Sequence, residues 1–403
     1  MSLEIHEPRD DELDEVAYVG AYSFEGDRSP EALEHRRSLY TVFRPLAAFQ
    51  NGRVVANLTL LSLPIAVNGG SQPFAGVASV ACLPEHRRKG YAGQLLTRAL
   101  EVMREQGQVL SGLYTPHFAL YRRYGWTLAG RVLRYSFRTK DVALTAAGAP
   151  RGEAMRVSHK EWAGLDALYG AHIARRNGYL HRSEQWWREA VLRGFFDQRR
   201  DDLDAAVWIT DDEWRGYVVY ETKARPDAGP RLRVRDFVAL DSDAYVGLVR
   251  YLLHHDLVAQ LQWWAPLDDP FLSLLHDPEP VQVAFEPGIC LRVVDVAGAF
   301  AARPCLAKTS GLQLTLELTD EAAPWNAGCW RLEAEDGHTL ARKWEGLADL
   351  SLDVSVLAAL YNGFLTPSEA ARGGLMKVHS EAALAAADRI FAVLCPPFTA
   401  DSF

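Results

Sequence analysis

A strand that passes into a helix through a short basic loop is the feature that most constrains how this 403-residue chain folds. Residues 77–92 read VASVACLPEHRRKGYA, in which an apolar β-forming run ends at a proline and a basic, glycine-containing loop precedes a helical pattern. The first amides of a helix have no intrahelical partner and carry the positive end of its dipole. Arg87 and Arg88 add positive charge, and Gly90 allows close approach. The segment therefore predicts a diphosphate-binding loop.

The composition describes a globular chain with no sign of membrane insertion. A length of 403 residues suggests two or three domains, and 48% hydrophobic residues suffice for their cores. No apolar run approaches the ~20 residues that cross a bilayer, and the start of the chain is acidic, unlike a signal peptide. We therefore expect a cytoplasmic protein without membrane contacts. The net charge of −9 argues against nucleic acid as a partner and weakly favours cationic amines as substrates.

The cysteines and histidines predict neither a disulfide framework nor a metal site. The five cysteines are scattered and form no CxxC pair. The pair His254 and His255 at a helix end has no third ligand at a suitable spacing. We therefore expect reduced thiols and no metal.

The first unit is expected to end at about residue 148. Helical patterns are followed by a hairpin, a strand, the basic loop with its helix, and further strands. The helix that follows the loop places its apolar residues on one stripe and should pack on a sheet. The expected elements are helices over 11–24, 30–43, 91–106 and 117–124, and strands over 53–67, 74–83, 108–114 and 131–139.

A second and a third unit are expected after the Ala-, Gly- and Pro-rich linker at 144–152. The second, over 149–290, repeats the element order of the first, but Asp241 and Asp243 stand where the first unit has its basic loop. Acidic side chains repel a diphosphate, so we predict a degenerate copy without cofactor. The third, over 291–403, has an alternating strand at 312–318, a hairpin over Asp336-Gly337 and two late helices, which predicts an α+β domain.

The loop resembles a known signature. Its spacing, Arg87-x-x-Gly90-x-Ala92, is similar to the (Q/R)xxGx(G/A) motif of GNAT acetyltransferases, which bind the pyrophosphate of CoA through loop amides. Over its whole length the chain resembles the enhanced intracellular survival (Eis) family, in which two GNAT-like domains precede a sterol-carrier-protein-like domain. The closest motifs are VACLPEHRRKGYAG and ALYRRYGW; looser likenesses are DFVALDSDAYVGLVRYLLHHD, PLDDPFLSLL, LRVVDV and the terminal phenylalanine.

The resemblance implies an activity and an assembly. Members of the family are hexameric N-acetyltransferases, and some acetylate aminoglycosides. The resemblance therefore implies that acetyl-CoA is the cosubstrate and that the chain forms a homo-oligomer, expected to be a hexamer. It leaves the acceptor open among small primary amines such as aminoglycosides and polyamines.

The resemblance also implies roles for individual residues. Tyr121 matches the general acid that protonates the CoA thiolate, and Phe403 matches the terminal residue whose carboxylate acts as base after the tail folds back into the first unit. A tyrosine with a pKa near ~10 can stabilise a thiolate of pKa near ~8.5 by a hydrogen bond, whereas an α-carboxyl near ~3.5 is a weak base. The expected cofactor contacts are the backbone of Val80 and Cys82, together with Arg87, Arg88, Gly90 and Ala92.

Three acidic residues are candidates for binding the amine. Glu25 and Asp27 follow the first helix and Asp401 lies in the tail, although surface carboxylates are most often simply solvated. Cys82 is interpreted as a small apolar residue, so we expect direct transfer in a ternary complex and no acyl-cysteine intermediate.

Simpler interpretations of these residues and other functions stay open. The loop can be an ordinary solvated basic loop, Tyr121 can be a core residue, and most chain termini have no function. A protein lysine can be the acceptor, or the chain can bind acyl-CoA or a lipid without catalysis.

Overall fold

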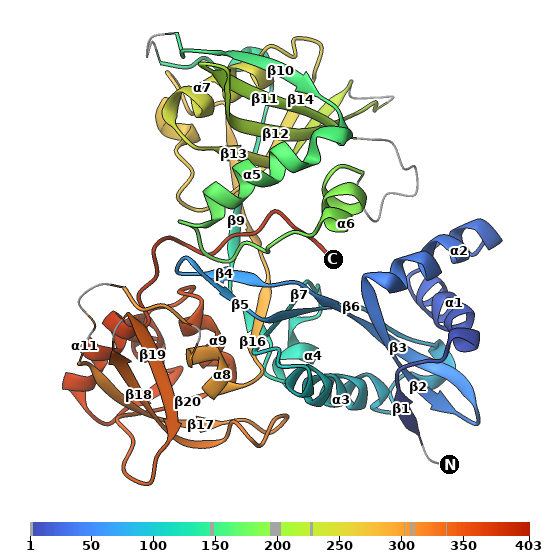
Figure 1. Ribbon diagram of the computed structural model, residues 1–403, viewed down its shortest axis with the longest axis vertical. Helices are drawn as coiled ribbons and strands as arrows, with labels where there is room; N and C mark the ends of the chain where they lie inside the picture. The colour runs from blue at the N-terminus through green and yellow to red at the C-terminus, as the bar shows by residue number, and fades with distance from the viewer. Residues whose placement is uncertain are drawn as a thin grey trace.

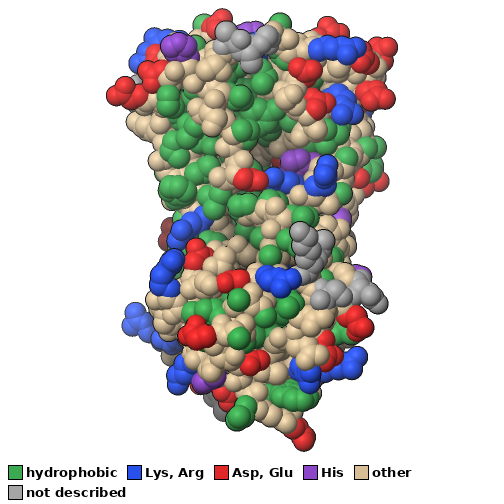
Figure 2. Space-filling view, turned by 90° about the vertical axis from the view of Figure 1, so that its left-hand side faces the viewer, with side chains coloured by type: hydrophobic (Ala, Val, Ile, Leu, Met, Phe, Trp, Pro, Cys, Tyr) green, Lys and Arg blue, Asp and Glu red, His purple; other side chains and the backbone are tan. Residues whose placement is uncertain are grey.

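The computed structural model describes residues 3–145, 149–193, 203–225, 229–301, 303–306, 309, 311–335 and 337–403. Figure 1 shows three lobes, with the N-terminal unit at the lower right, the second unit at the top and the third unit at the lower left. The red C-terminal segment leaves the third unit and ends between the other two. The side view in Figure 2 shows the upper and lower lobes meeting at a narrower waist.

The first unit is a seven-stranded sheet in the order β1-β2-β3-β6-β7-β16-β8, covered by helices on both faces. Leu95, Leu96 and Ala99 of α3 pack on one face, as the apolar stripe predicts, and α1 packs on the other through Val16 and Val19. A small pair, β4 and β5, lies beside the sheet. The bounds are β1 Glu4–His6, α1 Leu13–Ser23, α2 Pro30–Ser38, β2 Phe43–Gln50, β3 Arg53–Ser62, β4 Ile65–Val67, β5 Gly70–Gln72, β6 Phe74–Cys82, α3 Tyr91–Glu105, β7 Leu110–Leu113, α4 Phe118–Arg122, β8 Thr127–Leu128 and β16 Cys290–Val293.

The second unit is a second seven-stranded sheet in the order β10-β11-β12-β13-β14-β9-β15. Its helix α7 packs on one face through Ala244 and Leu248, and α5 and α6 contribute to the core on the other. The bounds are β9 Arg131–Phe137, β10 Glu153–Val157, α5 Trp162–Ile173, α6 Glu184–Trp186, β11 Asp204–Thr210, β12 Glu213–Lys223, β13 Arg231–Ala239, α7 Ser242–Leu253, β14 Gln260–Ala265 and β15 Gln282–Pro287.

Two strands lie in a different sheet from the one that chain order predicts. The strand expected to close the first unit, over 131–139, is β9, and it pairs with β14 and β15 of the second sheet. In exchange β16, which begins at Cys290, pairs with β7 and β8 of the first sheet. The placement of the 131–139 strand in the first unit is therefore wrong. Strand periodicity identifies a strand but not its partner, which here depends on residues more than a hundred positions away.

The third unit is an α+β domain built on a five-stranded sheet in the order β19-β18-β17-β20-β21. The expected hairpin is the antiparallel pair of β18 and β19, although Asp336 in its turn lies outside the described residues. Of the expected linker at 144–152, residues 146–148 also lie outside them. The bounds are α8 Val296–Ala301, β17 Gln313–Thr319, β18 Gly328–Glu335, β19 His338–Lys343, β20 Leu350–Asp353, α9 Val354–Tyr361, α10 Pro367–Arg372, β21 Met376–Val378 and α11 Glu381–Ile390.

The described residues include no membrane-spanning helix and no group of metal ligands. None of the helices within them has both the length and the apolar composition of a membrane span. Within the same part of the chain, no three His, Cys, Asp or Glu side chains are grouped as metal ligands would be.

A buried ion pair fastens the exchanged strand β16 to the third unit. The guanidinium of Arg292 donates to both carboxylate oxygens of Asp320, at 2.8 and 2.6 Å, and both side chains are almost fully excluded from solvent. Asp320 also accepts hydrogen bonds from the backbone of Ala323 and from Asn326. The pair therefore joins the first sheet to the domain that follows it.

We expect Arg292→Met to lower the free energy of unfolding by about 3 to 5 kcal/mol, because it leaves the Asp320 carboxylate buried without a counter-charge. Urea denaturation followed by tryptophan fluorescence measures the change. The matched control Arg342→Met, at an exposed position of β19, should shift stability by less than about 0.5 kcal/mol. A loss at Arg292 no larger than that of the control would contradict the role given to this pair.

Candidate functional site

The first sheet opens into a fork between β6 and β7. Their parallel pairing ends at Gly76, whereas β6 continues to Cys82. A bulge at Ser79, whose φ is +52°, shifts the register with β3 and turns the strand away from β7. In the described part of the chain, no strand pairs with this edge of β6 beyond Gly76. The backbone of Val80 and Cys82, predicted to contact a cofactor, lies in this stretch.

Helix α3 begins beside the fork with a free N-terminus. Its N-cap is Gly90, at φ +82°, which supplies no side chain to bond the first amides. A Cβ on Gly90 would meet nothing within 4 Å, so the space before the helix is open. Arg87 and Arg88 are exposed at its rim, and the Nε of Arg87 donates to the Cys82 carbonyl at 3.0 Å. Uncapped amides, open space and two arginines fit a diphosphate, and Ala92 lies in the same first turn.

The equivalent helix of the second unit is capped instead. Asp241 accepts a hydrogen bond from the Ala244 amide at 2.9 Å and another from the Nε of Arg215 at 2.9 Å. A carboxylate therefore fills the position that a phosphate would need at α7. This contact supports the prediction that the second unit takes no cofactor, which stays a prediction.

Tyr121 lies in α4 with 9% of its surface exposed. It packs in the core that includes Leu96 of α3 and Cys290 of the exchanged strand β16. Burial, and to a smaller extent proximity to Cys290, raises the pKa of Tyr121 to about 12. No described side chain or backbone group hydrogen-bonds to its hydroxyl, so the group is a protonated donor without an intramolecular acceptor.

The neighbouring aromatic residues have packing roles. A Cβ on Gly93 in α3 would lie 1.9 Å from the hydroxyl of Tyr124, so glycine at this position makes room for Tyr124, which follows α4. Trp126 is buried, and its indole NH donates to the Ser111 hydroxyl at 3.2 Å. Trp126 is therefore a core residue, whereas Tyr124 is half-buried and packs against the edge of that core.

Cys82 is a thiol and not a thiolate. Burial raises its pKa, and the positive charge of Arg87 opposes that shift only in part. The thiol contacts the Leu83 carbonyl at 3.6 Å. These properties suit a small apolar residue at the end of β6 better than a nucleophile.

The C-terminal segment ends at the same fork. The ring of Phe403 is buried against Gly76, where a Cβ would come within 2.6 Å of it. It meets the ring of Tyr114 edge-on at 5.4 Å and that of Phe74 at 6.3 Å. Tyr114 also donates to the backbone carbonyl of Asp401 at 2.7 Å. The tail thus lies in the first unit, although it leaves the third (Figure 1).

Asp401 fastens this tail to the second unit. Its carboxylate accepts from the Nε of Arg182 at 3.0 Å and from the indole NH of Trp186 at 2.7 Å. The same arginine donates to Asp236 of β13 at 2.5 Å, and its guanidinium lies 3.9 Å from the ring of Tyr169. Burial would lower the pKa of Arg182, but Asp236 and Asp401 outweigh it and hold the pKa well above its ordinary value. The Asp401 carboxylate is therefore paired with a buried cation, Arg182, which it shares with Asp236.

The other two acidic candidates lie elsewhere. Glu25 and Asp27 are exposed on the connection between α1 and α2. Asp27 accepts hydrogen bonds from the backbone and hydroxyl of Ser29, which lower its pKa. Ser29 in turn caps α2 by accepting from the Ala32 amide. The structure places Phe403 and the loop residues along the open stretch of β6, and Tyr121 in the core cluster that includes Val77 and Leu113. The roles of Glu25 and Asp27 stay predictions.

Comparisons with known proteins agree with this architecture. Residues 4–129 and 178–293 each match a model of an acetyltransferase (GNAT) domain, and residues 296–399 match a sterol carrier protein domain. The N-acetyltransferase Eis of Mycobacterium tuberculosis is 24% identical over the full length of both chains. The chain belongs to the Eis family of GNAT acetyltransferases. It is thus an N-acetyltransferase, as the resemblance implies.

Other relatives of this Eis-family chain agree in length and fold. An uncharacterized N-acetyltransferase of Streptomyces avermitilis is 28% identical over 93% of both chains. The crystal structure of Eis1 from Mycobacterium abscessus is 27% identical, has a TM-score of 0.83 and matches the whole of both chains. The expected fold class, two GNAT-like domains followed by a sterol-carrier-protein-like domain, is confirmed.

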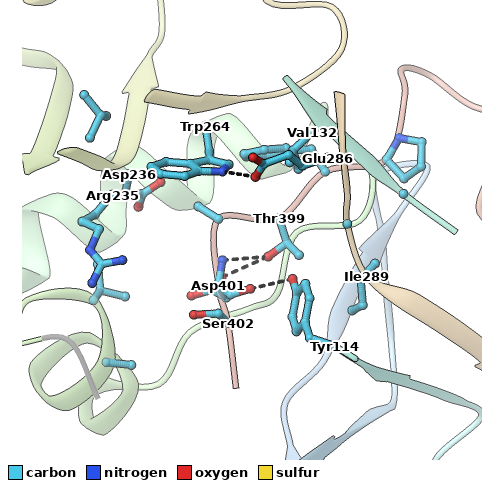
Figure 3. A pocket seen from close by; sticks show the side chains of 18 of the residues that line it. Tyr114, Val132, Arg235, Asp236, Trp264, Glu286, Ile289, Thr399, Asp401 and Ser402 are labelled. Carbon is cyan, nitrogen blue, oxygen red and sulfur yellow. Dashed lines mark hydrogen bonds between the residues drawn. The ribbon is translucent and has the colours of Figure 1, made fainter. Parts of the chain in front are cut away.

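A cavity of about 530 Å³ beside the tail was not foreseen from the sequence. It is bounded by the second sheet on one side and by the tail on the other, and Trp264 and Glu286 lie across it from Asp401 (Figure 3). The Trp264 indole NH donates to Glu286 at 2.7 Å. The alternating arginines of β13 are the one feature of the sequence that could have indicated this cavity. The strand exchange that brings its walls together leaves no recognisable pattern in the sequence.

We expect Arg182→Met to release the tail of this Eis-family protein, because both Asp236 and Asp401 lose their counter-charge. Carboxypeptidase A, which removes exposed C-terminal aromatic residues, should free Phe403 at least about tenfold faster than from the unaltered chain. Trp186→Phe removes one hydrogen bond to Asp401 and should give a smaller increase.

The control for this measurement is Arg188→Met, which removes an exposed i,i+4 pair with Glu184. It should leave the digestion rate unchanged. Equal rates for Arg182→Met and for this control would show that the ion pair does not hold the tail.

Proposed function

We propose that the chain transfers the acetyl group of acetyl-CoA directly to a small primary amine within a ternary complex. One observation carries the proposal: the free N-terminus of α3, the unpaired edge of β6 and the last residue Phe403 lie at one fork, and Tyr121 packs in the core cluster that includes Val77 of β6 and Leu113 of β7. The α3 amides with Arg87 and Arg88 would bind the diphosphate. The free edge of β6 at Val80 and Cys82 would hydrogen-bond the extended amide chain that leads to the thioester.

In the proposed reaction the amine nitrogen attacks the acetyl carbon, the C–N bond forms and the C–S bond breaks. Tyr121 donates a hydrogen bond to the sulfur as negative charge develops there. With a pKa of about 12 against ~8.5 for the thiol, complete proton transfer from Tyr121 would be uphill by about 5 kcal/mol. Tyr121 therefore acts mainly by stabilising the thiolate, which then takes its proton from solvent.

The nitrogen must lose a proton, and the carboxylate of Phe403 is the proposed acceptor. At a pKa near ~3.5 it lies about 7 units below an alkylammonium and cannot deprotonate one before attack. We therefore propose that the amine arrives neutral, at a cost of about 4 to 5 kcal/mol at pH 7, and that the carboxylate takes the proton after the C–N bond has formed. At that stage the nitrogen is far more acidic. Water carries the proton onward.

The size of the cavity beside the tail favours a small acceptor. About 530 Å³ falls within the range of roughly 300 to 1,000 Å³ that is usual for small-molecule sites. Aminoglycosides and polyamines stay candidates, and a protein lysine is the second choice because it calls for an open groove. Passive binding of acyl-CoA or a lipid is the remaining alternative. The hexamer that the resemblance implies also stays a prediction.

We expect Tyr121→Phe to lower kcat by about 10² to 10³, with the KM for acetyl-CoA changed less than about threefold, because the lost hydrogen bond acts on the developing thiolate. Thiol release from acetyl-CoA on a panel of aminoglycosides, polyamines, arylamines and lysine peptides measures this. Since Tyr121 must be protonated and its pKa is about 12, kcat should rise with pH as the amine loses its proton and should not fall before pH 10.5. If kcat falls near pH 10 in both the unaltered chain and Tyr121→Phe, the fall belongs to another ionising group. The pH dependence would then give no support to a role for Tyr121.

The role of the Phe403 carboxylate is tested by moving it while the ring is kept. We expect a chain extended by one glycine after Phe403 to lose at least about tenfold in kcat, as does the chain without Phe403, while both still bind acetyl-CoA. Phe403→Leu, which keeps the carboxylate in place, is the matched control and should keep most of the activity. Full activity of the extended chain would exclude the terminal carboxylate as the base.

A further inference from the structure

The carboxylates that line the cavity beside the tail are already engaged. Asp401 and Asp236 both bind Arg182, and Asp236 also accepts from the Tyr217 hydroxyl at 2.7 Å. Glu286 accepts from the indole of Trp264 and from Arg134. A cationic ligand would have to displace one of these partners, at the cost of leaving a charge unpaired.

Two arginines of the same lining lack comparable partners. Within the described residues no carboxylate lies within ion-pair distance of Arg131, whose guanidinium lies over the ring of Phe364 at 5.3 Å. Arg235 has one such neighbour, Glu221, at 3.3 Å, and shares it with Lys223 and Arg233 at 3.1 and 3.5 Å. Neither oxygen of Glu221 is within hydrogen-bonding geometry of these groups. The donors of Arg131 and Arg235 are therefore available to a ligand.

The local charge is opposite in sign to that of the whole chain. Arg231, Arg233 and Arg235 alternate along β13 and lie on one face of the second sheet, opposite the buried Leu232 and Val234. Burial, and then the charges of Arg233 and Arg225, lower the pKa of Arg231, as expected where cations are crowded. Although the whole protein has a net charge of −9, the three arginines give this face a positive charge that attracts anions.

We propose that the cavity beside the tail binds an anionic group, a carboxylate or a phosphate, and that the acceptor amine carries this group. The planar guanidinium groups of Arg131 and Arg235 match such oxyanions in geometry, and Trp264 supplies an apolar wall for the body of the ligand. Figure 3 shows Arg235 at one end of the cavity, and Asp401 and Ser402, which directly precede Phe403, on its tail side. An acceptor bound by its anion would direct its amine toward that tail side. This assignment of acceptor class rests on the proposed function.

Binding is measured by isothermal titration of matched probes into the full chain saturated with CoA, so that the α3 N-terminus is already occupied. Glucosamine 6-phosphate is compared with glucosamine, and 4-(2-aminoethyl)benzoate with phenethylamine. In at least one pair, we expect the Kd of the probe that carries the anionic group to be at least about tenfold lower than that of the amine without it. The first pair tests phosphate and the second tests carboxylate.

Variants locate the binding. Arg235→Gln and Arg131→Gln should each raise the Kd of the anionic probe by about fivefold or more and leave the Kd of the matched amine without the anion unchanged. The exposed control Arg342→Gln should change neither Kd. Equal Kd values within both pairs, no binding of any probe, or an anion preference that survives the two substitutions together would overturn the proposal.

Thiol release separates this inference from the proposed function. Acetylation of amines without any anion preference in binding would leave the acetyl transfer standing and remove the anion site. Anion-dependent binding at Arg131 and Arg235, without transfer to any amine, would leave the site standing and remove the proposed reaction.

Discussion

The buried ion network around Arg182 is the interaction on which the arrangement of the functional site depends. A single cation, 1% exposed at its side chain, binds one carboxylate from β13 and one from the tail. Rings of Tyr169 and Trp187 lie 3.9 and 4.7 Å from its guanidinium. Because a buried charge cannot lose its partner without a large penalty, the tail is held in one register relative to the second sheet. Phe403 follows Asp401 by two residues, so its position at the fork is set by this network.

The strand exchange has a related consequence. With β16 and β8 beyond it, β7 is an interior strand of the first sheet, and the two strands separate only after Gly76, where β6 continues through the bulge at Ser79. The fork therefore lies between two interior strands, beside a bulge, and not at an edge of the sheet. Since β16 comes from the far end of the second unit and β9 from the end of the first, neither sheet is complete without the other. The two GNAT-like units form one structural body.

The sequence predicted what depends on neighbouring residues and missed what depends on distant ones. Residues 77–105 were predicted as strand, phosphate-type loop and helix, because turn chemistry and periodicity are local signals. The placement of β9 was wrong, since pairing partners leave no mark in a single strand. Phe403 at the fork was expected only through the family resemblance. Arg182, Asp236 and Asp401 are far apart in the chain, and no sequence pattern links them, so their network required the structure.

The two GNAT-like units share a fold but differ at the end of their parallel strand pair. Both sheets have a parallel pair that ends early, β6 with β7 at Gly76 and β13 with β14 at Val234. In the first unit the helix beyond the fork is left uncapped by Gly90; in the second it is capped by Asp241. Beyond the second fork, Phe398 and Ala400 of the tail line a small cavity together with Phe237 and Trp263. The second unit therefore holds the chain's own tail close to the position where the first unit has its open fork. The N-cap residues differ in the same way as the proposed roles of the two units: glycine leaves the first amides of α3 open, whereas aspartate occupies those of α7.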